Sequence, residues 1–228
     1  MLLSVVIPTY NEAENIGTLL DFLIKNTPKS STEIIVSDGG SIDNTCFIAK
    51  KYNVKVVESP EKGRAAQMNF GVSQSSGEIL QFVHADTTPP KTFYNDILQA
   101  IDEDYPAGCF TYCFDSSSWI LKVNAYFTQF DKLWCRGGDQ AIFIKRAIFE
   151  EFGGYRNDYL IMEEYDLLKK IFKKYPFRII KNDAIVSARK YENNSYMRVQ
   201  IANFLVFNMY RFGYSQQKMV NMYRRILN

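Results

Sequence analysis

The chain has a single histidine and four cysteines among its 228 residues. The cysteines form no Cys-x-x-Cys pair and have no histidine at zinc-ligand spacing, so the sequence lacks the pattern of a multi-histidine or zinc-ribbon metal site. We expect free thiols, which are typical of an intracellular protein. No apolar run approaches the roughly 20 residues that a helix needs to span a bilayer, and Met1–Pro8 has no basic stretch of the kind that opens a signal peptide. We therefore expect a cytoplasmic protein.

The chain also lacks a strong excess of one charge. Its 27 Lys and Arg residues against 25 Asp and Glu residues give a net charge of +2, too balanced for a dedicated nucleic-acid-binding protein. The balance is uneven, because residues 189–228 carry seven basic residues and one acidic residue, a local +6, which leaves −4 for residues 1–188. Hydrophobic residues make up 46% of the chain, a composition that is typical of a globular protein.

Glycine-rich phosphate-binding motifs are absent. No Gly-x-Gly-x-x-Gly follows the first predicted strand, and no Gly-x-x-x-x-Gly-Lys-Ser/Thr occurs anywhere, which excludes the usual dinucleotide-binding and P-loop sites. A phosphate group would instead need a divalent metal held by a carboxylate such as Asp86, or a fixed positive charge such as Arg64 at the start of a predicted helix.

Short β-rich runs alternate with amphipathic segments over the first hundred residues. The predicted strands are Leu2–Ile7, Glu33–Ser37, Val54–Val57 and Glu78–Val83, and the predicted helices are Glu12–Asn26, Asp43–Tyr52, residues 62–75 and a segment that starts at Pro89-Pro90. This alternation predicts an α/β fold, with a Rossmann-like, mostly parallel central sheet, right-handed crossovers and helices on both faces.

The rhythm changes after Ala107. The predicted elements there are strands at Gly108–Phe114 and Gln140–Lys145, and helices at Trp119–Trp134, Asp166–Tyr175 and Met197–Phe212. The helix Met197–Phe212 is apolar on almost every side, which leaves three interpretations: burial against the body, burial between subunits of a homodimer, or contact with a membrane. With the local charge of +6, the third would place the protein peripherally at the inner face of the membrane, on anionic lipid or a polyprenyl-phosphate acceptor.

Polar residues follow each of the first four predicted strands: Thr9–Glu12, Asp38, Arg64 and His84–Thr87. Ligands bind at the carboxyl ends of the strands in open parallel sheets. A lone aspartate after a strand is often only a helix cap, and this alternative stands for Asp38 taken by itself. Four polar segments at one edge exceed what capping explains, so we expect a binding site there.

These segments and three later ones resemble the family 2 glycosyltransferases of GT-A fold. The matching segments are Pro8–Glu12, Ser37–Ser41, Gly63–Asn69, His84–Thr87, Gly138–Gln140, Gly153–Tyr155 and Met162–Glu164, and the resemblance covers about residues 2–190. It implies a single GT-A domain over residues 1–228. About 1–105 would be the nucleotide-sugar-binding half, about 106–190 the acceptor half, and 191–228 a C-terminal helical extension.

The resemblance implies that a nucleotide-diphospho-sugar donor contacts Pro8, Thr9, Tyr10, Glu12, Asp38, Gly39, Arg64, Asn69, His84, Ala85, Asp86, Asp139 and Arg189. Asp38 would accept a hydrogen bond from an imide N–H of the base, which suits uracil and also guanine; of the two donors, we expect UDP rather than GDP. Asp86 would ligate Mg²⁺ or Mn²⁺ as part of the family's Asp-x-Asp motif, in which His84 replaces the first acid. A histidine that only satisfies the strand end is the alternative for His84, and a turn-forming role is the alternative for Asp139.

Transfer with inversion requires a base that takes the proton of the acceptor hydroxyl. The resemblance assigns this role to Glu164, where the family usually has Asp; Asp166 is the rival, and Glu163 completes the acidic group. The alternative is that these acids only favour a helix N-terminus.

The implied function is metal-assisted transfer of a sugar to a hydroxyl of a sugar, lipid or polysaccharide acceptor, as in cell-envelope polysaccharide or glycolipid synthesis. The Gln-x-x-Arg-Trp signature of processive enzymes is absent, which favours single transfers. Two alternatives stay open: a nucleotidyltransferase, although Pro8–Glu12 contains neither Gly nor Lys or Arg, and a non-catalytic sugar-nucleotide-binding protein.

Overall fold

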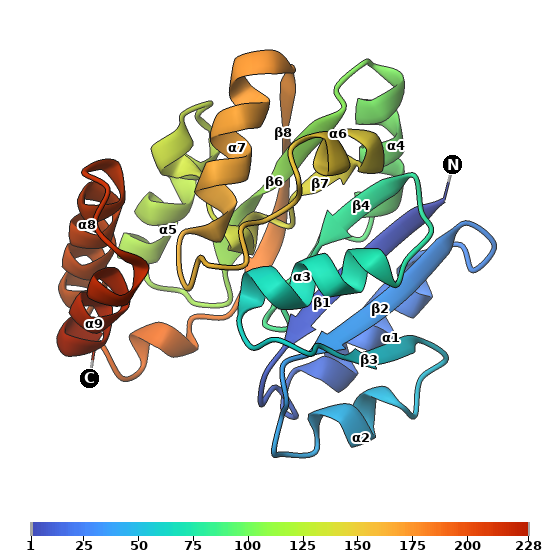
Figure 1. Ribbon diagram of the computed structural model, residues 1–228, viewed down its shortest axis with the longest axis horizontal. Coiled ribbons are helices and arrows are strands. Elements are labelled where there is room, and N and C mark those ends of the chain that lie inside the picture. Colours follow the sequence, from blue (N-terminus) through green and yellow to red (C-terminus); the bar gives the residue numbers. More distant parts are fainter. Residues whose placement is uncertain (1, 228) are drawn as a thin grey trace.

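The computed structural model describes residues 2–227 and is built around an eight-stranded mixed sheet (Figure 1). The strand order is β3-β2-β1-β4-β7-β6-β8-β5. The strands are β1 (Leu3–Thr9), β2 (Thr32–Asp38), β3 (Lys55–Glu58), β4 (Ile79–Phe82), β5 (Thr87–Thr88), β6 (Ala107–Phe114), β7 (Phe143–Lys145) and β8 (Phe177–Val186). The helices are α1 (Ile16–Asn26), α2 (Thr45–Ala49), α3 (Arg64–Ser73), α4 (Phe93–Asp102), α5 (Trp119–Tyr126), α6 (Arg146–Glu151), α7 (Glu163–Lys174), α8 (Tyr196–Arg211) and α9 (Gln216–Leu227).

Strands β3, β2, β1 and β4 run parallel to one another, as the sequence predicts. β7 lies antiparallel between β4 and β6, and β8 is parallel to β6. The α/β fold with a largely parallel sheet is therefore confirmed, and the antiparallel β7 joins the two halves of the chain into one continuous sheet.

Helices cover both faces of this sheet because the side chains of β1 alternate between them. Val5 and Ile7 pack with α1 and α4 on one face, whereas Val6 packs with α3, α6 and α7 on the other (Figure 1). All three are fully buried. A fully buried aliphatic side chain of this size stabilises the fold by about 1.5–3 kcal/mol, so the two faces hold the strand ends in place.

The N-terminal half has the predicted elements, with three helices changed in their bounds. The helix predicted over Asp43–Tyr52 is shortened to α2, and the helix predicted to start at Pro89-Pro90 begins at Phe93. The helix predicted from Glu12 begins at Ile16 instead. The reason is local: the backbone N–H of Glu12 donates to Thr45 Oγ1 at 2.7 Å, and that of Ala13 donates to Asp43 Oδ2 at 3.1 Å. These bonds commit residues 12 and 13 to the neighbouring loop, so Glu12 lies in a turn at the edge of the sheet.

Two predictions in the second half are wrong. The helix predicted over Trp119–Trp134 ends at Tyr126 and is followed by short 3₁₀ turns. The buried guanidinium of Arg136 donates to the carbonyl oxygens of Thr128 and Phe130, which takes these groups out of a helical ladder. The strand predicted over Gln140–Lys145 is shortened to β7, because Gly138–Gln140 forms a 3₁₀ turn.

The chain ends in two helices, α8 and α9, that pack on each other at one side of the molecule (Figure 1). Within residues 2–227, no helix combines the length and the apolar character needed to cross a bilayer.

Candidate active site

The carboxyl ends of β1 and β2 meet at one edge of the sheet, where Thr9 is the register partner of Asp38. Asp38 is buried, and its carboxylate accepts hydrogen bonds from the Thr9 and Ser41 hydroxyls and from the backbone N–H groups of Gly40 and Ser41. Burial alone would raise the pKa of Asp38, but these four hydrogen bonds outweigh it and lower the pKa. Asp38 therefore organises the turn after β2, and its contact with a nucleotide base stays a prediction.

Glu12, Asp86 and Arg189 come together from three distant parts of the chain. The Arg189 guanidinium lies 2.6 Å from Glu12 Oε1 and 3.2 Å from Asp86 Oδ2. The backbone N–H of Ser187 also donates to the carbonyl of Asp86, which fixes the C-terminal segment against the end of β4. One positive charge thus lies between two carboxylates at the predicted metal position.

A second charged cluster surrounds the N-terminus of α7. Arg64 Nη1, at the start of α3, lies 3.2 Å from Glu163 Oε1 and 3.9 Å from Glu164 Oε1. The carboxylates of Glu163 and Glu164 are almost completely buried. Burial and the neighbouring charge of Glu163 raise the pKa of Glu164 to about 7, although Arg64 and His84 act in the opposite direction.

His84 connects this cluster to Asp139. Its Nδ1 lies 3.1 Å from Asp139 Oδ1, and its Nε2 lies 4.0 Å from Glu164 Oε1. Burial and Arg64 act to lower the pKa of His84, but the hydrogen bond and the charge of Asp139 outweigh them and raise it. Burial likewise acts against ionisation of Asp139, whose pKa nevertheless falls to about 2 because of His84 and Arg64. His84 therefore faces the acids of the cluster, consistent with both a positioning role and the strand-end alternative.

Gly138 has a role in this cluster that the sequence does not reveal. A Cβ atom at Gly138 would lie 2.2 Å from Glu164 Oε1 and 2.3 Å from His84 Cε1. Glycine is therefore required for the 3₁₀ turn to approach both side chains. In the sequence, the pair Gly137-Gly138 indicates a turn at this position. Only the structure shows that Gly138, and not Gly137, has no room for a side chain.

Tyr155 is a second residue that sequence reasoning missed. Its hydroxyl is buried and has no hydrogen-bond partner among residues 2–227. Burial and the charges of Glu164 and Glu163 raise its pKa. The Gly153-Gly154-Tyr155 motif marks the segment in the sequence, yet nothing there shows that the ring reaches the acids of α7.

The other predicted site residues lie outside the two charged clusters, and some of them have structural roles. The Asn69 amide donates to the carbonyl of Tyr155 at 2.7 Å and to Asn157, so it connects α3 to the turn before α7. Asp166 pairs with Lys170 on its own helix at 2.8 Å and lines a separate cavity of about 420 Å³. Pro8 and Ala85 are buried, Gly39 packs against Gln67, and Tyr10 is half exposed. Donor contacts of these residues stay predictions.

Comparisons with known proteins identify the family and the fold. The pattern of the family described as Glycosyl transferase family 2 matches residues 4–163. Glycosyltransferase AglE of Haloferax volcanii is 42% identical over 93 residues, which are 38% of this chain and 31% of that protein. An uncharacterized glycosyltransferase of Haemophilus influenzae is 26% identical over 199 residues, which are 77% of this chain and 64% of that protein. The chain thus spans only about a third of AglE, and less than two thirds of either relative.

Solved structures share the fold at low sequence identity. Residues 1–349 of Staphylococcus aureus TarS in complex with UDP-GlcNAc superpose with a TM-score of 0.71 at 18% identity, covering 100% of this chain and 72% of that one. The mannosyltransferase PcManGT of Pyrobaculum calidifontis in complex with GDP-Man and Mn²⁺ gives a TM-score of 0.69 at 24% identity, covering 99% of this chain and 67% of that one. The fold is accordingly GT-A, and the chain belongs to glycosyl transferase family 2.

Proposed function

We propose that the protein transfers a sugar from a nucleotide-diphospho-sugar to an acceptor hydroxyl with inversion, and that Glu164 is the base. One observation carries this proposal: Glu164 Oε1 is buried and accepts no hydrogen bond from any residue between 2 and 227. A buried acceptor without a partner costs free energy, and a hydroxyl of the acceptor substrate would satisfy it. Its pKa of about 7 suits an atom that takes a proton near neutral pH.

The proposed step is a single displacement. The acceptor oxygen attacks the anomeric carbon on the side opposite the diphosphate, the bond from that carbon to the diphosphate oxygen breaks, and the hydroxyl proton passes to Glu164 Oε1. Arg64 Nη1 and His84 Nε2 lie 3.9 Å and 4.0 Å from this oxygen, beyond hydrogen-bond distance. Asp166 Oδ2 is likewise buried without a hydrogen bond, but it lies 2.8 Å from the Lys170 ammonium and lines a different cavity, which favours Glu164 over Asp166 as the base.

The donor nucleotide would lie along the strand ends, between Thr9–Glu12 and the turn after β2. We propose UDP rather than GDP, with the imide N–H of uracil replacing the Ser41 hydroxyl as a donor to Asp38. Structures of the GT-A fold include complexes with both nucleotide types, UDP-GlcNAc in TarS and GDP-Man in PcManGT, so the nucleotide is a question for experiment.

Asp86 is the proposed ligand of Mg²⁺ or Mn²⁺. Residues 2–227 contain no group of three or more His, Cys, Asp or Glu side chains that could enclose a metal ion. However, Asp86 and Glu12 already share one cation, the Arg189 guanidinium, and Mg²⁺ commonly binds through one or two carboxylates together with substrate phosphates. The donor set therefore fits an ion that binds together with the diphosphate, whose developing negative charge it would neutralise. Arg189 would then exchange Asp86 for the diphosphate.

The same assignment divides the chain into functional parts. We propose that about residues 1–105 bind the nucleotide sugar and about 106–190 bind the acceptor, with 191–228 as a helical extension. The acceptor would be a sugar, a lipid or a polysaccharide of the cell envelope.

A thermal-shift panel with UDP, GDP, CMP and ADP, each with and without Mn²⁺ or Mg²⁺, tests the donor assignment. A ligand at 100 times its Kd stabilises a protein by about 2.7 kcal/mol, enough to raise the Tm by a few degrees. We expect a metal-dependent shift with UDP that Asp86→Asn removes. The absence of a shift with every nucleotide would contradict the proposed site, whereas binding without turnover would indicate a sugar-nucleotide-binding protein.

A further inference from the structure

Helix α8 buries its small side chains and exposes its large ones. The buried residues are Val199, Ala202 and Val206, whereas the exposed apolar residues are Met197, Ile201, Phe204, Leu205 and Phe212 at its end. Ile201 is four residues after Met197, and Phe204 and Leu205 are three and four residues after Ile201. Phe212 follows about two turns after Leu205, so the exposed set lies on one side of the helix. We call these exposed residues the α8 stripe. A helix that packs only on its own domain would bury its large apolar side chains, and α8 exposes them instead.

A similar stripe runs along α5 and the turn after it. Leu121 is the buried residue of α5, and the exposed apolar residues are Trp119, Val123, Tyr126, Phe127 and Phe130. Their rings contact one another, with the centroids of Tyr126 and Phe130 5.5 Å apart. Trp134, also exposed, lies 6.0 Å from Phe127, so both tryptophans of the chain belong to this surface. We call these residues the α5 stripe.

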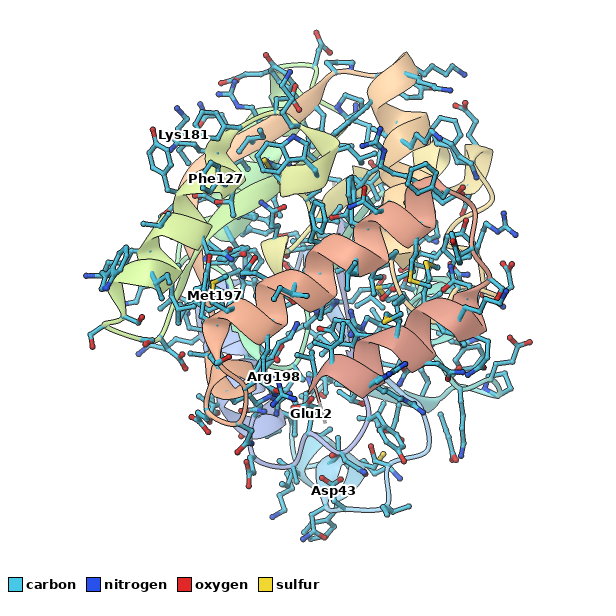
Figure 2. The ribbon with its side chains drawn as sticks, turned by 90° about the vertical axis from the view of Figure 1, so that its left-hand side faces the viewer. Glu12, Asp43, Phe127, Lys181, Met197 and Arg198 are labelled. Carbon is cyan, nitrogen blue, oxygen red and sulfur yellow. The ribbon has the colours of Figure 1, made fainter. Side chains whose placement is uncertain are left out.

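The two stripes belong to helices on the same side of the molecule. In Figure 1, α5 and α8 are neighbours at the left, and Figure 2 looks directly at that side, with Phe127 and Met197 both labelled on it. Exposed apolar side chains that occur singly are normal, but two adjacent stripes rich in aromatic residues mark a binding surface.

Basic side chains accompany both stripes and outnumber acidic ones. Arg198 lies two turns before Leu205 and Arg211 two turns after Phe204, so each is beside the α8 stripe. Lys122, three residues after Trp119 and four before Tyr126, shares the face of the α5 stripe. Residues 193–228 contain no Asp or Glu, and residues 119–134 contain one, the exposed Asp131, beside Lys132.

We propose that this side of the molecule binds the surface of an anionic lipid bilayer, with the two stripes at the level of the headgroups. Tryptophan and tyrosine rings favour that position, and Lys and Arg beside them pair with anionic headgroups. A homodimer through the same face would bring Arg198, Arg211 and Lys122 of two copies together, and these segments offer them one acidic residue, Asp131. Charge complementarity therefore selects the lipid surface over a second copy. The proposal is independent of donor and acceptor chemistry.

Vesicle flotation of the full chain, without nucleotide or metal, tests the proposal. Vesicles of 70% phosphatidylcholine and 30% phosphatidylglycerol should bind the protein, vesicles of phosphatidylcholine alone should bind it at least tenfold more weakly, and 0.5 M NaCl should weaken binding to the anionic vesicles. Because both tryptophans lie in the α5 stripe, their emission should shift to shorter wavelength on binding.

Matched variants locate the surface. The double variant Ile201→Ser/Phe204→Ser should bind anionic vesicles at least tenfold more weakly. The double variant Ile42→Ser/Phe47→Ser, which alters exposed apolar residues beside and on α2, should bind within twofold of the wild type. The double variant Arg198→Gln/Arg211→Gln should lose the salt-sensitive part of binding while leaving the core untouched.

Three results would overturn the proposal. They are an absence of binding at excess anionic lipid, equal loss of binding in the α8 and α2 double variants, and sedimentation of the wild type as a dimer that Ile201→Ser/Phe204→Ser converts to a monomer. The last would assign the surface to a second copy of the chain.

Discussion

The guanidinium of Arg189 lies 3.2 Å from the carboxylate of Asp86, 103 residues earlier in the chain, and so places a positive charge where a metal ion is proposed. The same guanidinium holds Glu12 at 2.6 Å. The segment before α8 therefore closes over the strand ends, and any divalent cation at Asp86 has to compete with this arginine.

Replacing Arg189 should make metal binding easier in the absence of nucleotide. An exposed ion pair contributes about 0.2–1 kcal/mol, so Arg189→Gln should tighten Mn²⁺ binding by about 1.4-fold to fivefold. Titration calorimetry or the electron paramagnetic resonance of free Mn²⁺ measures this directly. Arg178→Gln is the control, because it removes a comparable ion pair, with Glu103, that is not part of the Glu12–Asp86–Arg189 cluster. It should leave the affinity for Mn²⁺ unchanged. Weaker Mn²⁺ binding in Arg189→Gln would show that the arginine does not compete with the metal.

A methyl group at position 138 should damage the site, whereas one at position 137 should not. The added Cβ of Gly138→Ala would overlap Glu164 Oε1 and His84, which forces the base out of position. Gly137→Ala is a matched control, because its extended backbone has a φ of −171° and no heavy atom lies within 4 Å of the added Cβ. Sugar transfer should fall at least tenfold in Gly138→Ala, in line with the sensitivity of rates to misplaced groups. Equal kcat values for the two variants would contradict the packing described for this loop.

The rate of transfer should depend on the ionisation of Glu164. The base acts as a carboxylate, so kcat should rise with pH and level off above the pKa of about 7. Glu163 and Arg64 flank the carboxylate directly, and His84 faces it at 4.0 Å. Because the charge of Glu163 raises the pKa of Glu164, Glu163→Gln should move the rising limb of the pH profile to lower pH. A shift to higher pH would indicate that another group controls the rate.

Much of the N-terminal half can be predicted from the sequence, since β1, β2 and β4 contain compact apolar runs with polar residues after them; β3 has only Val56 and Val57 between two charged residues. The parallel sheet explains why Glu12 and Asp86 lie close together, because both follow the carboxyl ends of its strands. It does not explain the position of Arg189, which follows β8 in the second half of the chain. No strand is predicted over Phe177–Val186, where Lys181, Asn182 and Asp183 interrupt the apolar pattern; β8 forms through long-range pairing with β6. The end of α5 depends on Arg136, whose hydrogen bonds to Thr128 and Phe130 have no local sequence signature.

Helix α8 is another element whose environment cannot be predicted from the sequence alone. The apolar composition of Met197–Phe212 permits burial, dimerisation or membrane contact, and the structure shows that only one side of α8 is buried. Phe204 and Leu205 are exposed, whereas Val206 is buried. Which side of such a helix faces the body depends on tertiary contacts, here Tyr165 of α7 against Phe207 and Tyr210.

Nucleotide release from a panel of sugar nucleotides, compared between the wild type and Glu164→Gln, tests the central claim most directly. Water can replace the unknown acceptor in a slow reaction, so release is measurable without identifying the acceptor. We expect metal-dependent release by the wild type, and a loss of about 10²–10⁴-fold in Glu164→Gln with the thermal shift by nucleotide and metal retained. The rival variant Asp166→Asn should keep most of the rate. Release at the wild-type rate by Glu164→Gln would contradict the assignment of Glu164 as the base.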